Sequence, residues 1–115
     1  MKRGGVPNLS HRLELQRPER LSDGAGGHVT TWVTLGTVWA EIVAASGRER
    51  VRAALTFSTV PCRITVRSAP VGSLARPRPE QRFLQGGRAL RILAVADSDV
   101  SSRYLTCIAE EEVVA

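Results

Sequence analysis

Two histidines are the side chains best suited to proton transfer or metal binding in this 115-residue chain. His11 and His28 each flank a stretch of alternating apolar residues, and neither lies near a serine-elbow motif that would supply a nucleophile. A metal site built on both imidazoles would still need a carboxylate brought to them from elsewhere in the chain. We therefore expect both histidines to be exposed loop residues and not catalytic groups.

The cysteines and the glycine cluster lack the partners that their usual chemistry needs. Cys62 and Cys107 have neither a CxxC partner nor a nearby histidine pair, so a zinc site lacks its ligands. Both lie in alternating apolar stretches, which favours reduced, buried core thiols over a disulfide. The glycines between residues 24 and 27 are not followed by the GK[ST] sequence or helix start of a phosphate-binding loop.

The acidic run Glu110–Glu112 is the remaining candidate for a metal site. Adjacent residues on a strand point to opposite faces, so the three carboxylates would not converge on one ion, and a solvated tail is expected instead. No catalytic, cofactor-binding or metal-binding residue can therefore be nominated. The sequence predicts a protein that is not an enzyme.

Arginine dominates the charge of the chain. The formal net charge is +5, and fifteen of the sixteen basic residues are arginine. The planar guanidinium suits carboxylates in subunit interfaces as well as phosphates, so charge alone does not choose between protein and nucleic-acid partners. The aromatic residues are too scattered to form the stacking platform typical of single-strand binders.

One arginine cluster is a candidate contact with a channel or an adjoining ring. Arg48, Arg50 and Arg52 recur at every second position, which on a strand would place all three on one face. There they could meet DNA phosphates or a neighbour's carboxylates, whereas on a helix they would fan out. A solvated loop is the simplest alternative, because charge runs usually face water.

The elements that would position these residues are short strands. Alternation or β-branched composition predicts strands over residues 12–17, 29–33, 37–43, 62–67, 82–84, 89–96 and 103–109, with hairpin turns at 22–27 and 85–87. Residues 1–10 are expected to be a flexible arm, 46–60 a long loop in which a short helix is allowed, and 68–80 a proline-rich connection. The fold class is mainly β: one small antiparallel β-barrel domain, or a sandwich, over residues 11–115.

Two strands carry residues that suit a subunit interface. Trp39 lies opposite the core face of Val38, Ala40 and Ile42, so it is expected either at the barrel end or in a contact with another subunit. In the strand at 62–67, Cys62, Ile64 and Val66 face inward while Arg63, Thr65 and Arg67 face outward. Trp39, Arg63 and Arg67 are therefore the candidate interface residues.

Length and composition favour assembly. Aromatic residues make up only 4% of the chain, so the core must be aliphatic and thin, and a domain of this size gains from packing against copies of itself. No signal peptide precedes the first strand, and no stretch approaches the ~18 apolar residues of a membrane span. The sequence thus predicts a soluble protein made in the cytoplasm, without a membrane partner.

Taken in order, several stretches resemble the phage head-tail joining family. His11–Pro18 fits the pattern HRxxxQRP of the first strand of the family, and the match continues through the T-W-V stretch at 31–33. It then carries VWAE at 38–41, SGRE at 46–49, RITVR at 63–67 and GGRALRILAV at 86–95. Each motif alone is weak, but their order and spacing agree from about His11 to Ala109.

The resemblance implies a connector subunit, also called a stopper or head-completion protein. Such subunits form a ring at the neck of a phage or gene transfer agent, assembled in the bacterial cytoplasm. The ring would contact portal and adaptor proteins above and the tail terminator or tail tube below, with double-stranded DNA passing through it. A hexamer is expected because tail tubes are six-fold, and a dodecamer matching the portal is the alternative. The competing hypotheses are a tail terminator ring and, from a different class, a basic nucleic-acid-binding β-barrel.

The arginine cluster yields the first prediction. Reversing the charges of Arg48, Arg50 and Arg52 together should leave the domain folded, because surface changes rarely cost more than ~0.5 kcal/mol. Particles carrying the triple variant should retain less DNA or attach fewer tails, as measured by electron microscopy and DNA content. Fully tailed, DNA-filled particles would show that the cluster is not needed for DNA retention or tail attachment.

Overall fold

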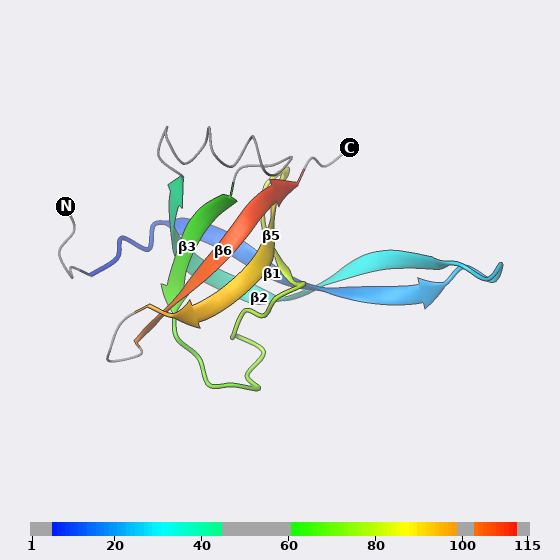
Figure 1. Ribbon diagram of the computed structural model, residues 1–115, viewed down its shortest axis with the longest axis horizontal. Coiled ribbons are helices and arrows are strands. Elements are labelled where there is room, and N and C mark those ends of the chain that lie inside the picture. Colours follow the sequence, from blue (N-terminus) through cyan, green and yellow to red (C-terminus); the bar gives the residue numbers. More distant parts are fainter. Residues whose placement is uncertain (1–5, 45–60, 99–102, 113–115) are drawn as a thin grey trace.

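Six antiparallel strands close into a barrel in the computed structural model, which describes residues 6–44, 61–98 and 103–112 (Figure 1). The strands are β1 (His11–Ser22), β2 (His28–Ala44), β3 (Pro61–Arg67), β4 (Arg82–Gln85), β5 (Arg88–Asp97) and β6 (Tyr104–Glu112). They follow the order β1-β2-β3-β6-β5-β4, and β4 pairs with β1 to complete the circuit. The predicted antiparallel β-barrel is confirmed. Residues 46–60, in which the sequence allows a short helix, lie outside the described residues.

Aliphatic side chains fill the barrel, with one phenylalanine among them. The alternation read from the sequence is confirmed on β1 and β3, since Leu13 and Leu15 of β1 and Ile64 and Val66 of β3 are fully buried. The buried cluster comprises Leu13, Leu15, Ala40, Ile64, Val66, Phe83, Leu90, Ile92, Leu105, Cys107 and Ala109. No helix in the described part of the chain is long and apolar enough to cross a membrane.

Two details of the strand pattern differ from expectation. Thr65 points away from the core but is only 8% exposed, because this short side chain lies on a central strand between the registered residues Glu41 and Thr106. The acidic run Glu110–Glu112 is not a solvated tail. It forms the end of β6 and pairs with β5 from Ala89 to Arg91, and this pairing extends the strand beyond its predicted end.

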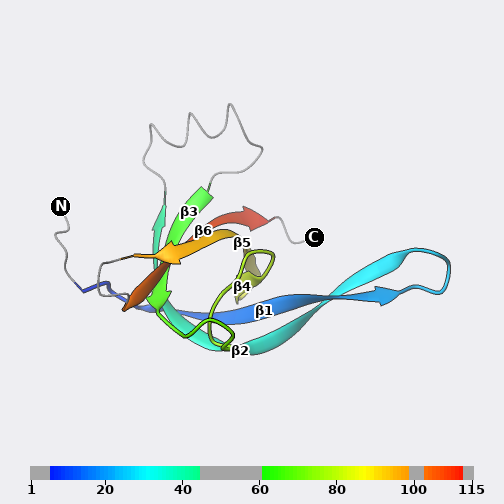
Figure 2. The ribbon, with the colours of Figure 1, turned by 60° about the horizontal axis from the view of Figure 1, so that its bottom comes forward.

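The first hairpin extends far beyond the barrel. β1 pairs with β4 only from Glu14 to Gln16, and β2 pairs with β3 only from Ala40 to Ala44. Beyond these contacts the two strands pair with each other alone, from Arg17↔Val33 to Ser22↔His28, as a twisted two-stranded ribbon (Figures 1 and 2). We call residues 17–33 the arm, which is distinct from the flexible N-terminal segment expected over residues 1–10. At roughly 3.3 Å per residue, its strands reach about 20 Å from the barrel.

Special backbone positions stand at both ends of the arm. At its root the register shifts between Leu15 and Gln16, so that Leu35 is an extra residue on β2, and such a bulge bends and twists the ribbon. At its tip Gly24 and Gly26 adopt positive φ values of 80° and 89°, which only glycine takes without strain. The predicted hairpin turn is therefore confirmed.

The proline-rich connection between β3 and β4 packs against the barrel. Pro77 is fully buried, and the Arg76 guanidinium donates a hydrogen bond to the carbonyl of Ala69 across 2.9 Å. The amide of Ser68 donates to the carbonyl of Arg103, at the start of β6, across 2.8 Å. The segment has no strand or helix, as expected, but these contacts fix it on one end of the barrel (Figure 2).

The packing of β3 yields a stability prediction. Replacing the fully buried Ile64 with Asp should unfold the protein, because an unpaired carboxylate in the core costs several kcal/mol out of a total of about 5–10 kcal/mol. Arg63→Asp, one residue earlier on the exposed face, is the matched control and should melt near the wild-type temperature in a thermal scan. A wild-type melting temperature for Ile64→Asp would show that the core face is assigned wrongly.

Candidate interaction surfaces

A polar cluster fixes the arm where it leaves the barrel. Gln16 of β1 is only 7% exposed; its Nε2 donates to Thr34 Oγ1 across 3.0 Å, and its Oε1 accepts from Arg82 Nε across 2.8 Å. The guanidinium of Arg82 also lies 4.2 Å from the centre of the Trp32 ring, a cation–π contact. Because arginine can only donate, the orientation of the Gln16 amide is determined by Arg82. We call these four residues the arm junction.

The arm itself presents two different faces. Leu21 and Val29 are register partners near the tip and share one face, which also carries Glu19 and Thr31. The opposite face carries Trp32 and turns toward the barrel, where it borders a shallow, polar depression formed with Glu80 and Arg91. The face of Leu21 and Val29 is thus the one without a covering element among the described residues.

The tip is held by a carboxylate. Asp23 accepts hydrogen bonds from the amides of Ala25 (2.8 Å) and Gly27 (3.0 Å), and these bonds lower the pKa of Asp23 below its usual value. The turn is therefore ordered by its own side chain rather than by the barrel.

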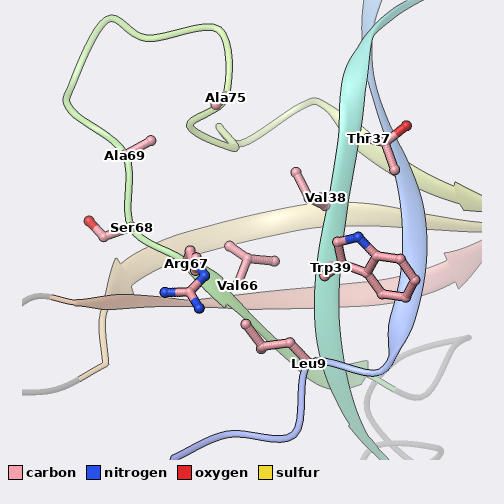
Figure 3. A pocket seen from close by; sticks show the side chains of 9 residues that line it. All are labelled: Leu9, Thr37, Val38, Trp39, Val66, Arg67, Ser68, Ala69 and Ala75. Atoms are coloured by element: carbon pink, nitrogen blue, oxygen red, sulfur yellow. The ribbon is translucent and has the colours of Figure 1, made fainter.

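A largely apolar hollow lies at the other end of the molecule. Its volume is about 250 Å³, and its walls are Leu9, Thr37, Val38, Trp39, Val66, Arg67, Ser68, Ala69 and Ala75 (Figure 3). The indole of Trp39 lies on the outer side of β2, and Arg67 stands at the end of β3, so two strands and the proline-rich connection frame the hollow. The N-terminal residues border it too, and the Asn8 amide donates to the Glu41 carboxylate across 3.0 Å.

The candidate interface residues from the sequence are partly brought together. Trp39 and Arg67 line the same hollow, whereas Arg63 lies exposed farther along β3, opposite Val43 of β2 and Ile108 of β6. Arg48, Arg50 and Arg52 lie outside the described residues. No observation tests whether any of these residues contacts another subunit, so that role stays a prediction.

Some of the charged side chains form exposed ion pairs. Arg88 pairs with Glu111 across 3.1 Å, Arg91 with Glu80 across 3.4 Å, and Arg17 with Glu19 across 3.6 Å. Such solvent-exposed pairs contribute about 0–1 kcal/mol each, so they contribute little to the stability of the barrel.

The candidate chemical groups are separated in space. His11 begins β1 and contacts Gln85 through Nδ1 at 3.2 Å, while His28 begins β2 at the far end of the arm. Cys62 and Cys107 are free thiols, and burial raises the pKa of Cys107 to about 12, which keeps it protonated at neutral pH. Among the described residues, no three histidine, cysteine, aspartate or glutamate side chains form a cluster that could hold a metal.

Comparison with protein families identifies the class of this molecule. The family model described as phage head completion protein matches residues 5–112. The chain belongs to this family. Head completion proteins are structural components of virions, so the protein is a non-enzymatic virion component.

Solved structures agree with the family. A chain described as "Virion of native gene transfer agent (GTA) particle" is 53% identical, with a TM-score of 0.77, over 96% of this chain and all of that one. The solution structure of protein SF1141 from Shigella flexneri 2a is 21% identical, with a TM-score of 0.64, over 92% of this chain and 95% of that one, and it shows the shared fold. A search of curated proteins gave no match.

The arm junction is the feature that sequence reasoning missed. Gln16 and Trp32 both lie in motifs that carried the family resemblance, but alternation alone assigns neither of them a partner. Arg82 carries no distinguishing signal among fifteen arginines. The available clue was that Gln16 and Trp32 lie two register positions apart on one face of the predicted hairpin, Gln16 opposite Thr34 and Trp32 opposite Pro18.

The arm junction yields a prediction. Arg82→Ala removes one hydrogen bond and one cation–π contact, so it should destabilise the head completion protein by about 1–2 kcal/mol and lower the melting temperature by several degrees. In a Trp39→Phe background, the emission of Trp32 should shift to the red because the ring loses its cover. Arg88→Ala, which loses an exposed ion pair away from Trp32, is the control. Equal behaviour of the two variants would contradict the importance of the junction.

Proposed function

We propose that this head completion protein is a subunit of the connector, or stopper, ring between the head and the tail. The ring would sit below the portal and adaptor proteins, retain packaged double-stranded DNA, and offer the surface on which the tail terminator or tail tube docks. The observation that carries the proposal is the 53% identity, over 96% of this chain, to a chain described as part of a gene transfer agent virion. We therefore place the protein at the neck of a phage-like particle.

The architecture supports a role in assembly. Every buried side-chain nitrogen and oxygen in the described part of the chain has a hydrogen-bond partner, so no orphaned polar group is aimed at a small ligand. The six strands close into a barrel, whereas the arm keeps open strand edges and exposed apolar side chains. A structural subunit uses such surfaces for contacts with other proteins.

The symmetry of the particle supports a ring. Tail tubes are six-fold, so we propose a hexamer, with a dodecamer matching the portal as the alternative. Isolated protein can remain monomeric, because the adaptor presents many docking sites close together and raises the effective concentration of subunits. Ring formation on the particle therefore does not require a stable ring in free solution.

Removal of the gene from a particle-producing strain tests the proposal. Heads should assemble and package DNA but carry no tails in negative-stain images, and their DNA should become accessible to added nuclease. Wild-type protein supplied in trans should restore tails, whereas Ile64→Asp should not. Normally tailed particles without the protein would refute the proposal. Tailless heads whose DNA resists nuclease would refute the retention role alone.

A further inference from the structure

The uncovered face of the arm carries two large apolar side chains. Leu21 is 48% exposed and Val29 is 51% exposed, and as register partners they form one continuous apolar patch near the tip. A two-stranded ribbon is at best marginally stable in water unless a further element packs against it. The patch is thus a surface suited to burial against a partner.

The hollow beside Trp39 has the complementary character. Trp39 is 53% exposed and its indole projects from the outer side of β2, while Leu9, Val38 and Val66 line the hollow from the other side of that strand (Figure 3). At about 250 Å³ the hollow exceeds the roughly 150 Å³ of an engineered cavity that accepts benzene, so it has room for aliphatic side chains.

Charges near the two surfaces are also complementary. Glu19 lies two residues before Leu21 on the same face of the arm, while Arg67 lines the hollow. Glu19 pairs with Arg17 only across 3.6 Å on the surface. A guanidinium from another molecule could therefore bind the Glu19 carboxylate as Leu21 enters the hollow.

The two surfaces cannot meet within one chain. Val29 and Trp39 stand ten residues apart on the same strand, β2, which separates them by roughly 30 Å. The patch and the hollow are different surfaces at opposite ends of one rigid strand. A contact between different surfaces of identical subunits is heterologous, and it generates a ring when the rotation closes.

We infer that the arm of one subunit docks through Leu21 and Val29 into the Trp39 hollow of the next copy of this chain, with Glu19 facing Arg67. This inference rests on the proposed ring and specifies its subunit contact. The arm junction holds the ribbon in the direction that this contact needs, and each subunit both gives an arm and receives one.

Cysteine cross-linking tests the contact. In a Cys62→Ala background, Leu21→Cys combined with Ala75→Cys should give a ladder of disulfide-linked oligomers when concentrated protein is oxidised and run on a non-reducing gel. The buried Cys107 thiol is retained because it is inaccessible. An equimolar mixture of the two single variants should give dimers containing one chain of each and nothing larger, because each chain then has only one linkable end.

The matched control keeps Leu21→Cys and places the second cysteine at Val43, which is exposed on β2 outside the hollow. The control should form at least several-fold less oligomer. Equal cross-linking of both pairs, or monomer alone from Leu21→Cys/Ala75→Cys both in concentrated solution and in tailed particles, would overturn the inference.

Charge exchange in the Leu21→Cys/Ala75→Cys protein tests the polar part of the contact. Glu19→Arg should reduce the oligomer yield several-fold, and adding Arg67→Glu should restore most of it. Circular dichroism should show that each variant is folded. Failure of the second change to restore cross-linking would contradict the Glu19–Arg67 pairing.

The same cysteine pair in assembled particles separates this inference from the proposed function. If tails require the protein but Leu21 links to a different virion protein or to nothing, the docking contact is wrong while the connector role stands. If particles are tailed normally without the protein, the proposed function itself fails. A linked ladder released from tailed particles supports both.

Discussion

The direction of the arm depends on one buried amide. Gln16 bonds to Thr34 on the partner strand and to Arg82 of β4, and Arg82 in turn covers Trp32 of the arm. Three strands are therefore tied together at the point where the hairpin leaves the barrel. Without this cluster the bulge at Leu15/Gln16 would leave a two-stranded ribbon free to swing, and a ribbon that swings cannot dock in a fixed direction.

The barrel provides the rigid base for this arrangement. Its closure needs β4, which has only four residues and touches β1 over three register positions. Phe83, the one aromatic residue of the buried cluster, sits in this short strand, and Arg82 beside it serves the arm junction. The same four residues thus close the barrel from the inside and orient the arm from the outside. Core packing and the direction of the arm are consequently coupled in this protein.

Much of the barrel could be predicted from the sequence, because a sheet with one buried face imposes a period of two. The alternation around Leu13, Val38 and Ile64 correctly predicts which face of β1, β2 and β3 points into the core. Strand ends were less predictable: β1 was expected to stop before Pro18, yet proline is tolerated on a strand with an open edge, and β1 continues to Ser22. The length of β6 was also predicted too short, because the pairing of its acidic end with β5 depends on tertiary register. Side-chain contacts between distant strands, such as Gln16 with Arg82, leave no periodic signal, and the hollow arises only when the proline-rich connection folds back toward Trp39.

The central claim is that this head completion protein acts as one subunit of a ring at the neck of a phage-like particle. A reconstruction of the neck from purified tailed particles, with the protein identified in the density, measures this directly. The account predicts a closed ring between head and tail in which each arm crosses to the adjacent copy. A single copy at the neck, or density for this protein elsewhere in the particle, would contradict it.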